Sequence, residues 1–200
     1  TDLRQLGVVQ PDTPRIVSEY WTGGTDTWGG SHQTIDAATH EYRLAQILAS
    51  GAQFNLAPFH GGTNFAFNGG RLSGGDDGFV TTSADGDAPL HEAGGRAEKY
   101  AATKRISTFA SHFSHIFAGL QSQSPHAAVT PTETNHPLSV VHLPGDQGDV
   151  AFLFKSAQDK TTSVDLMLPD GQNLPVPMGS DRVGWLLLEA NLGPVRLNYT

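Results

Sequence analysis

The stretch that decides the fold is PRIVSEYWTGG, residues 14–24. Its first six residues form a short run with two adjacent β-branched side chains, Ile16 and Val17, and the run stops in the glycine-rich segment 22–30. A short β-branched run that is bounded by turn residues is typical of a buried strand. The pattern therefore predicts a strand over 14–19 that carries Glu19 at its C-terminal end.

The residues that follow predict an alternation of helix and strand. Apolar residues at three- and four-residue spacing indicate a helix over about 34–50, with Thr34 as its N-cap. A second strand is expected over 53–59 and a second helix over about 96–117. The segment between them, 60–95, is rich in Gly, Asp and Ser, and loops of that length are usually functional. This order of elements is typical of a parallel α/β unit.

The pattern changes after residue 120. Residues 121–135 lack periodicity and consist largely of Ser, Gln, Pro, Thr and Ala, which predicts a linker. Beyond it, short apolar runs alternate with turn clusters, as expected for a small antiparallel sandwich or barrel fragment. The expected strands are 138–143, 150–154, 164–168, 183–188 and 195–199. We therefore predict three parts, 1–120, the linker 121–135 and a β-domain over 136–200, with Trp185 in the core of the last.

Composition limits the classes of partner. The formal net charge is −8, and this excess of acid argues against nucleic acid and anionic membrane surfaces. No apolar stretch approaches the ~20 residues of a membrane span. The chain has no cysteine, so disulfides and thiolate metal sites are excluded. Neutral substrates such as sugars remain compatible.

Glu19 is the first candidate for chemistry. Active sites of α/β barrels are built where strands end and loops begin, which is the predicted position of this residue. Trp21 and Trp28 follow within nine residues, and aromatic rings are surfaces on which sugars stack. From these residues alone two interpretations stay open: a catalytic carboxylate, or a surface or salt-bridged glutamate.

Three motifs carry a resemblance to a known family. They are SEYWTGG at 18–24, NLAPFHGGTNF at 55–65, and DGDAPL at 85–90, the last followed by EAG at 92–94 and EKY at 98–100. In this order and spacing they resemble glycoside hydrolase family 35, the β-galactosidases. The resemblance covers about half of the chain, from near residue 10 to near residue 118.

The resemblance implies a fold and a reaction. The fold is α/β: the C-terminal portion of a (β/α)8 TIM barrel, followed by the small all-β antiparallel domain. The reaction is hydrolysis of terminal β-galactosides with retention of configuration, in which Glu19 matches the nucleophile. A second carboxyl about 5–5.5 Å away protonates the leaving group in such enzymes. Trp21, Ala57 and Asp85 fall at positions implied to bind substrate, and neither a metal nor another cofactor is expected.

The acid/base partner is expected outside this chain. The family carries it after an asparagine on an earlier barrel strand, which this sequence lacks. Glu41 and Glu98 fall on predicted helices and Glu92 in a loop, so none of them is a credible acid/base. The chain also opens at Thr1 without a methionine, and its sequence predicts a strand almost at once. We therefore expect the missing N-terminal half of the barrel as a partner.

Several positions depart from the family pattern. Ala57, Ala84 and Gly86 stand where members usually place tyrosines around the galactose, and Trp21 also replaces a tyrosine. These changes indicate a reshaped pocket, another glycone or linkage, or lost activity. The alternative function is a non-catalytic carbohydrate-binding or structural remnant. The compartment stays open, with a preference for an extracytoplasmic or secreted protein because polymeric glycans are mostly met there.

Other polar residues favour structural roles. His60 either contacts substrate or is packed or hydrogen-bonded, and a packed or hydrogen-bonded histidine is favoured. Asp76 and Asp77 lack the regular spacing of a calcium loop, so a solvated loop is expected. His112 and His115 stand three residues apart on a predicted helix, but no third metal ligand is evident.

Overall fold

The computed structural model describes the chain over five stretches, residues 2–73, 78–121, 130–132, 137–168 and 170–199. The chain forms two compact units. The first comprises residues 1–16, 42–53 and 106–200, and the second comprises residues 17–41 and 54–105.

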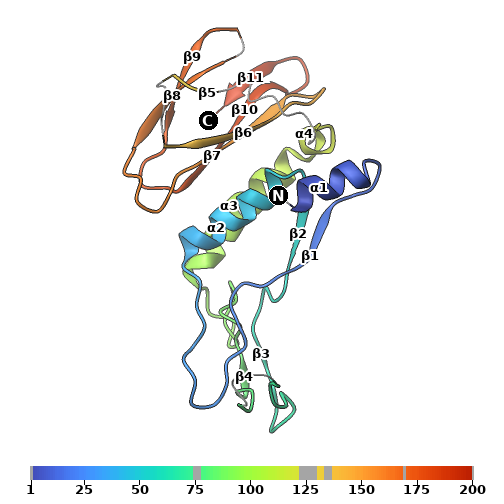
Figure 1. Cartoon of the computed structure of the whole chain (residues 1–200), viewed down its shortest axis with the longest axis vertical. Helices are drawn as coiled ribbons and strands as arrows, with labels where there is room; N and C mark the ends of the chain where they lie inside the picture. Colours follow the sequence, from blue (N-terminus) through green and yellow to red (C-terminus); the bar gives the residue numbers. More distant parts are fainter. Residues whose placement is uncertain (1, 74–77, 122–129, 133–136, 169, 200) are drawn as a thin grey trace. The chain divides into compact units, whose positions relative to one another are not determined.

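Two antiparallel sheets dominate the first unit (Figure 1). The larger sheet has the strand order β11-β10-β7-β6, formed by Arg196–Tyr199, Val183–Asn191, Asp149–Phe154 and Ser139–Leu143. The smaller sheet has the order β5-β8-β9, formed by Thr130–Pro131, Ser163–Met167 and Asn173–Pro177. The strands expected near residues 140, 152, 165, 185 and 197 are thus confirmed.

The two sheets share an apolar core. Leu153 of β7 and Leu186 of β10 are fully buried, and they belong to one cluster with Leu166 of β8 and Val176 of β9. Side chains along a strand alternate between the faces of a sheet, so each strand presents every second residue to this core. The result is a small sandwich with two inner faces in contact.

The opposite face of the larger sheet is aromatic and packs on helical residues of the same unit. The ring of Phe154 lies 5.1 Å from that of Tyr42, and Trp185 stacks on Phe109 at 5.5 Å between ring centroids. Trp185 therefore packs against a helix rather than within the strands alone. The predicted linker falls largely on 122–129 and 133–136, which lie outside the described residues, so the boundary at that point stays a prediction.

Strand β9 was not predicted, and its sequence explains why. It reads NLPVP, with prolines at 175 and 177. Proline cannot donate a backbone hydrogen bond and is confined to edge strands, so it lowers the strand signal. The structure places β9 at the edge of the smaller sheet, paired only with β8 among the described strands.

Residues 2–9 are helical, and the expectation that the chain runs almost at once into a strand was wrong. Helix α1 spans Asp2–Val9, and the Arg4 guanidinium donates to the carbonyl oxygen of Ala49 at 3.3 Å. Eight residues are too few for a clear helical period, and Gly7, Val8 and Val9 are weak helix formers, so the sequence carries little signal for this helix.

The next elements follow the predicted order of strand, helix and strand. They are β1 (Ile16–Tyr20), α2 (Ala37–Leu48) and β2 (Gln53–Leu56), and β1 pairs with β2 (Figure 1). The N–H of Gln53 donates to the oxygen of Arg15, and the N–H of Ala57 donates to the oxygen of Tyr20, each at 2.9 Å. The residue numbers increase along both strands from the first hydrogen bond to the second, so the two strands are parallel.

Helix boundaries differ slightly from the prediction. Asp36, not Thr34, caps α2, because its carboxylate accepts the N–H of Thr39 at 2.8 Å. The single helix expected over 96–117 is divided into α3 (Glu98–His112) and α4 (Ser114–Ala118). Inside the expected loop, β3 (Gly62–Thr63) and β4 (Ser83–Ala84) form a short antiparallel pair.

Buried polar contacts join the first halves of α2 and α3 in the second unit. The ring of His40 lies 2.8 Å from the Thr103 hydroxyl, with both residues buried. Arg105 donates to the buried Glu41 carboxylate through two nitrogens, Nε at 2.7 Å and Nη2. Glu41 is thus committed to an ion pair between helices.

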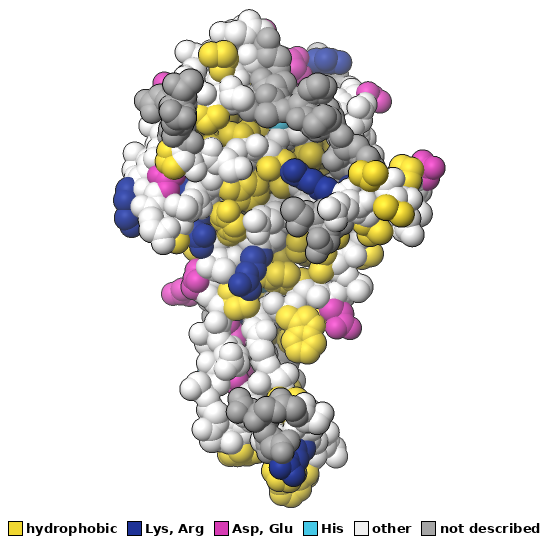
Figure 2. Space-filling view, in the orientation of Figure 1, with side chains coloured by type: hydrophobic (Ala, Val, Ile, Leu, Met, Phe, Trp, Pro, Cys, Tyr) yellow, Lys and Arg dark blue, Asp and Glu magenta, His cyan; other side chains and the backbone are white. Residues whose placement is uncertain are grey.

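The surface carries dispersed charge. On the face drawn in Figure 2, Lys and Arg side chains stand apart among uncharged atoms. The described residues of that face therefore present no continuous cationic surface. Within the described part of the chain, every helix is too short or too polar to cross a membrane.

Candidate active site

A cavity of about 510 Å³ opens in the second unit beside the end of β1. It is lined by residues from three segments, 19–26, 57–64 and 80–86. The first segment starts within β1, and the other two contain β3 and β4, which pair with each other, so backbone pairing helps to set the position of the walls. The volume lies within the range of about 300–1,000 Å³ that is typical of small-molecule sites.

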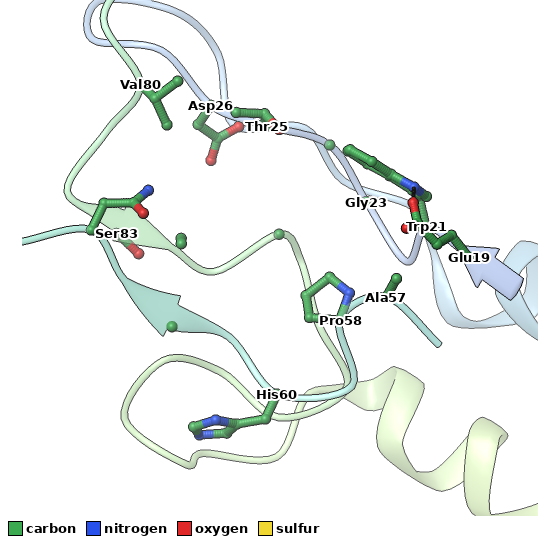
Figure 3. Close-up of a pocket in the computed structure, with 15 residues that line it drawn as sticks. Glu19, Trp21, Gly23, Thr25, Asp26, Ala57, Pro58, His60, Val80 and Ser83 are labelled. Carbon is green, nitrogen blue, oxygen red and sulfur yellow. Dashed lines mark hydrogen bonds between the residues drawn. The ribbon is translucent and has the colours of Figure 1, made fainter. Parts of the chain in front are cut away.

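Glu19 and Trp21 lie together at one end of this cavity (Figure 3). Both side chains are exposed, and the indole N–H of Trp21 donates to the Glu19 carboxylate at 3.3 Å. The two predicted site residues are therefore brought together, with the carboxylate oriented by a neighbour two residues along the chain.

Small residues form much of the remaining wall. Ala57, Ala84 and Gly86 all line the cavity, and Ala57 precedes the cis-proline Pro58. These are the three positions at which the family resemblance implied tyrosines. Because alanine and glycine fill little space, the cavity is wider there than bulky aromatic residues would leave it.

Polar residues that were not predicted also reach the cavity. Asp26, Asn64 and Ser83 line it, and so does His60. Figure 3 places Asp26 and Val80 at the end away from Glu19. His60 is exposed, so it is not packed in the interior, and its expected hydrogen bonding stays a prediction. The only sequence signal for these residues was their place inside or beside the three motifs.

Asp26 is held by its own loop. Its carboxylate contacts Nδ1 of His32 at 2.5 Å and accepts the N–H of Gln33 at 2.9 Å. Burial by itself raises the pKa of Asp26, but the hydrogen bonds from Gln33 and His32, with the charge of His32, hold the pKa below its ordinary value of 3.8. The hydrogen bond to Asp26 raises the pKa of His32 above 6.5, against a smaller opposing effect of burial.

These shifts predict a pH window for the pair. Its contribution to folding stability is lost as pH falls through the lowered pKa of Asp26 and as pH rises through the raised pKa of His32. Because the His32 side chain is 47% exposed, the contribution stays below about 1 kcal/mol. In an NMR titration His32 should therefore titrate above 6.5. Asp26→Asn should return that pKa toward 6.5, whereas Asp146→Asn, at an exposed site in the other unit, should not. A wild-type value at or below 6.5 would contradict the assignment.

Asp85 is not brought to the cavity. Its carboxylate accepts the N–H of Glu92 at 3.1 Å and lies 3.2 Å from Nδ1 of His91. Its nearest contact toward the loop of Asp26 is Nε2 of His32, at 3.9 Å. The neighbours Ala84 and Gly86 line the cavity in its place. Asp85 therefore holds the turn that follows it.

The remaining glutamates of the matched region do not line the cavity. Glu41 is paired with Arg105, and Glu98 begins α3. Glu92 accepts the hydroxyl of Thr63, and this bond, followed by one from Ser83, lowers the pKa of its carboxyl. Asp26 and Glu19 are the carboxylates of the cavity lining.

No metal centre is found in the part of the chain that is described. No three His, Cys, Asp or Glu side chains of that part come together as metal ligands do. His115 contacts the carbonyl oxygen of Asn191 at 3.1 Å. Asp76 and Asp77, considered above for calcium, lie outside the described residues.

Comparison with known proteins agrees with the motifs. Beta-galactosidase-1-like protein 3 of Homo sapiens is 40% identical over 102 residues, which are 51% of this chain and 16% of that protein. Beta-galactosidase-1-like protein 2 of Homo sapiens is 44% identical over 92 residues, or 46% and 14% of the two chains. Beta-galactosidase of Homo sapiens is 46% identical over 97 residues, or 48% and 14%. The chain thus matches about one seventh of the length of these relatives.

The match to a family covers more of this chain than the match to any one of these three relatives. The profile of Glycosyl hydrolases family 35 covers residues 2–110, more than half of the 200 residues and all three motifs. The cavity and Glu19 lie inside the matched range. The chain therefore belongs to glycosyl hydrolases family 35, as its motifs had indicated.

Proposed function

We propose that this chain supplies the nucleophile half of the active site of a retaining glycosidase that cleaves terminal β-D-galactosyl residues. The observation that carries the proposal is the place of Glu19, at the end of β1 and in the wall of the cavity beside Trp21. Membership of family 35 supports the reaction class, and the names of the relatives support galactose as the sugar.

The proposal includes the fold of the whole enzyme. The parallel pair β1 and β2, the helix α2 between them and the helix α3 after β2 have the order of two consecutive strand–helix units. In a (β/α)8 barrel the active site lies at the C-terminal ends of the strands, where Glu19 stands. The six other units, and with them the acid/base, would come from the preceding N-terminal part of the barrel.

In the proposed reaction Glu19 attacks the anomeric carbon. A bond forms between a Glu19 oxygen and that carbon as the bond to the leaving oxygen breaks, and the leaving oxygen takes a proton from the second carboxyl. The same group then removes a proton from water, which attacks the anomeric carbon and releases Glu19. The indole N–H of Trp21 orients the carboxylate for the first attack.

Asp26 does not suit the role of that second carboxyl. A general acid must be protonated at the working pH, and the contacts with Gln33 and His32 keep the pKa of Asp26 low. The acid/base is therefore proposed to lie outside this chain, in agreement with the family pattern.

A specific observation favours a second candidate. The tyrosine positions occupied by Ala57, Ala84 and Gly86 all face the cavity, so aromatic contacts with a sugar would be lost there. A carbohydrate-binding remnant without turnover would tolerate this loss. The two functions differ in whether Glu19 forms a covalent bond to the sugar.

Covalent trapping tests the proposal. The complete enzyme, meaning this chain with the N-terminal part of the barrel, is treated with an activated 2-deoxy-2-fluoro-β-galactoside, digested and analysed by mass spectrometry. We expect the label on the peptide that contains Glu19, with protection by excess galactose. A label on another residue would refute the assignment, and binding of galactose without any label would favour the remnant.

A further inference from the structure

Lys99 is a buried charge in the second unit. It lies in the first turn of α3, and its side chain is 3% exposed. Its ammonium group donates to a carboxylate oxygen of Asp87 at 2.5 Å and to the backbone oxygen of Thr22 at 2.7 Å. Burial of an ammonium group is costly unless it is paired and hydrogen-bonded. Here the pairing reaches two segments that are distant from each other in the sequence.

Both partners of Lys99 adjoin the walls of the cavity. Thr22 lies three residues after Glu19 and directly before Gly23, and Asp87 directly follows Gly86. Gly23 and Gly86 are lining residues. The ammonium group thus lies behind the cavity, bound to the segment that carries Glu19 and to the segment that carries Gly86.

The two walls touch. A Cβ atom added at Gly23 would lie 2.5 Å from the Cβ of Asp87 and 2.5 Å from the oxygen of Gly86. The hydroxyl of Thr22 lies 3.1 Å from the oxygen of Pro58 and 3.2 Å from that of Gly86. Thr22 is fully buried, so these contacts are shielded from water. One threonine and one lysine therefore join the three lining segments.

Asp87 is itself fixed in an uncommon conformation. Its φ is 48°, in the left-handed region that non-glycine residues rarely adopt. Besides Lys99, its carboxylate accepts the N–H of Ile35 at 2.6 Å. A strained backbone of this kind persists only where surrounding contacts hold it, and such residues cluster at functional sites.

We propose that Lys99 is a positioning residue of the active site. It holds the segment that carries Glu19 against the segment that carries Gly86, and so sets the distance and direction from which Glu19 approaches the anomeric carbon. Lys99 does not line the cavity, so the proposed role is to position its walls and not to bind substrate. This inference rests on the proposed function of Glu19 as nucleophile.

Lysine suits this role because its ammonium is compact and carries three donors. Methionine keeps the length of the side chain and removes the donors. Arginine keeps the charge but spreads its donors over a planar fork. A displacement near 1 Å at a reacting group costs on the order of 100-fold in rate. We therefore expect Lys99→Met to lower kcat by about 100-fold with KM changed less than about threefold, and Lys99→Arg to recover part of the loss.

The experiment compares matched variants of the complete enzyme. Lys104→Met, on the same helix but exposed, is the control and should leave kcat and KM unchanged. Thermal unfolding is followed for each variant, and the kinetics are measured at a temperature at which every compared variant is folded. If Lys99→Met does not fold, Lys99→Met with Asp87→Asn removes both charges and is judged by the same criterion. A folded variant of either kind with kcat within about threefold of wild type would overturn the proposal.

Trapping with the fluorinated galactoside tests the positioning role of Lys99 separately from the proposed role of Glu19 as nucleophile. Label on Glu19 of the wild-type enzyme, with slower labelling in Lys99→Met, supports both the nucleophile role of Glu19 and the positioning role of Lys99. Label on wild-type Glu19 at the same rate in Lys99→Met overturns the role of Lys99 alone. Absence of label at Glu19 in the wild-type enzyme overturns the proposed function, and the positioning role with it.

Discussion

Replacing Glu19 by glutamine in the complete enzyme is expected to lower kcat for an aryl β-galactoside by about 10³-fold or more. Glutamine keeps the size of the side chain and removes the attacking carboxylate. Because Glu19 is exposed, the substitution should leave the thermal unfolding temperature close to that of wild type. The loss therefore reports chemistry rather than folding, and steady-state kinetics with a thermal melt measure both.

A matched control and a rescue sharpen this result. Glu98→Gln makes the same change at an exposed residue of α3 and should keep wild-type kinetics. Glu19→Gly leaves a space in which azide can attack the anomeric carbon from the side that Glu19 faces. The expected product is α-galactosyl azide, with the carbon–nitrogen bond formed as the carbon–oxygen bond breaks. Activity of Glu19→Gln within about tenfold of wild type would contradict the nucleophile assignment.

Residues 1–200 alone are expected not to hydrolyse a β-galactoside. The carboxylates of the cavity lining are Glu19 and Asp26, and the low pKa of Asp26 leaves the leaving oxygen without a proton donor. General acid–base assistance is commonly worth about 100- to 10,000-fold. The rate of the chain alone should therefore fall below that of the complete enzyme by at least this factor.

The structure gives a second reason for the same expectation. A closed barrel needs eight strands, and among the described residues β1 and β2 form a sheet of two. Unpaired strand edges of this kind favour association with other chains. The test is release of an aryl alcohol from its β-galactoside by the purified chain, alone and after addition of the N-terminal part of the barrel. Turnover by the chain alone within about tenfold of the complete enzyme would contradict the prediction, because a second competent carboxyl would then lie within it.

Local patterns were enough for the main elements. Period-two alternation and turn clusters marked the strands near 140, 152, 165 and 185, and apolar spacing marked α2. Two of the elements that escaped prediction, β9 and α1, carry conflicting local signals. The prolines of β9 oppose a strand, and α1 is short and contains Gly7. Pairing or packing with residues outside each element stabilises both of them and outweighs their local propensity.

The sequence by itself determined the family, the strand that carries Glu19 near its end and the proximity of Trp21, because each depends on residues that are neighbours in the chain. Only the tertiary structure decided which polar residues face the cavity. It turned Asp85 away toward His91, brought Asp26 and His60 in, and placed Lys99 on Thr22 across 77 positions of sequence. Such contacts depend on how segments that are far apart in the sequence pack together. A local periodicity in the sequence does not show which distant residues come into contact.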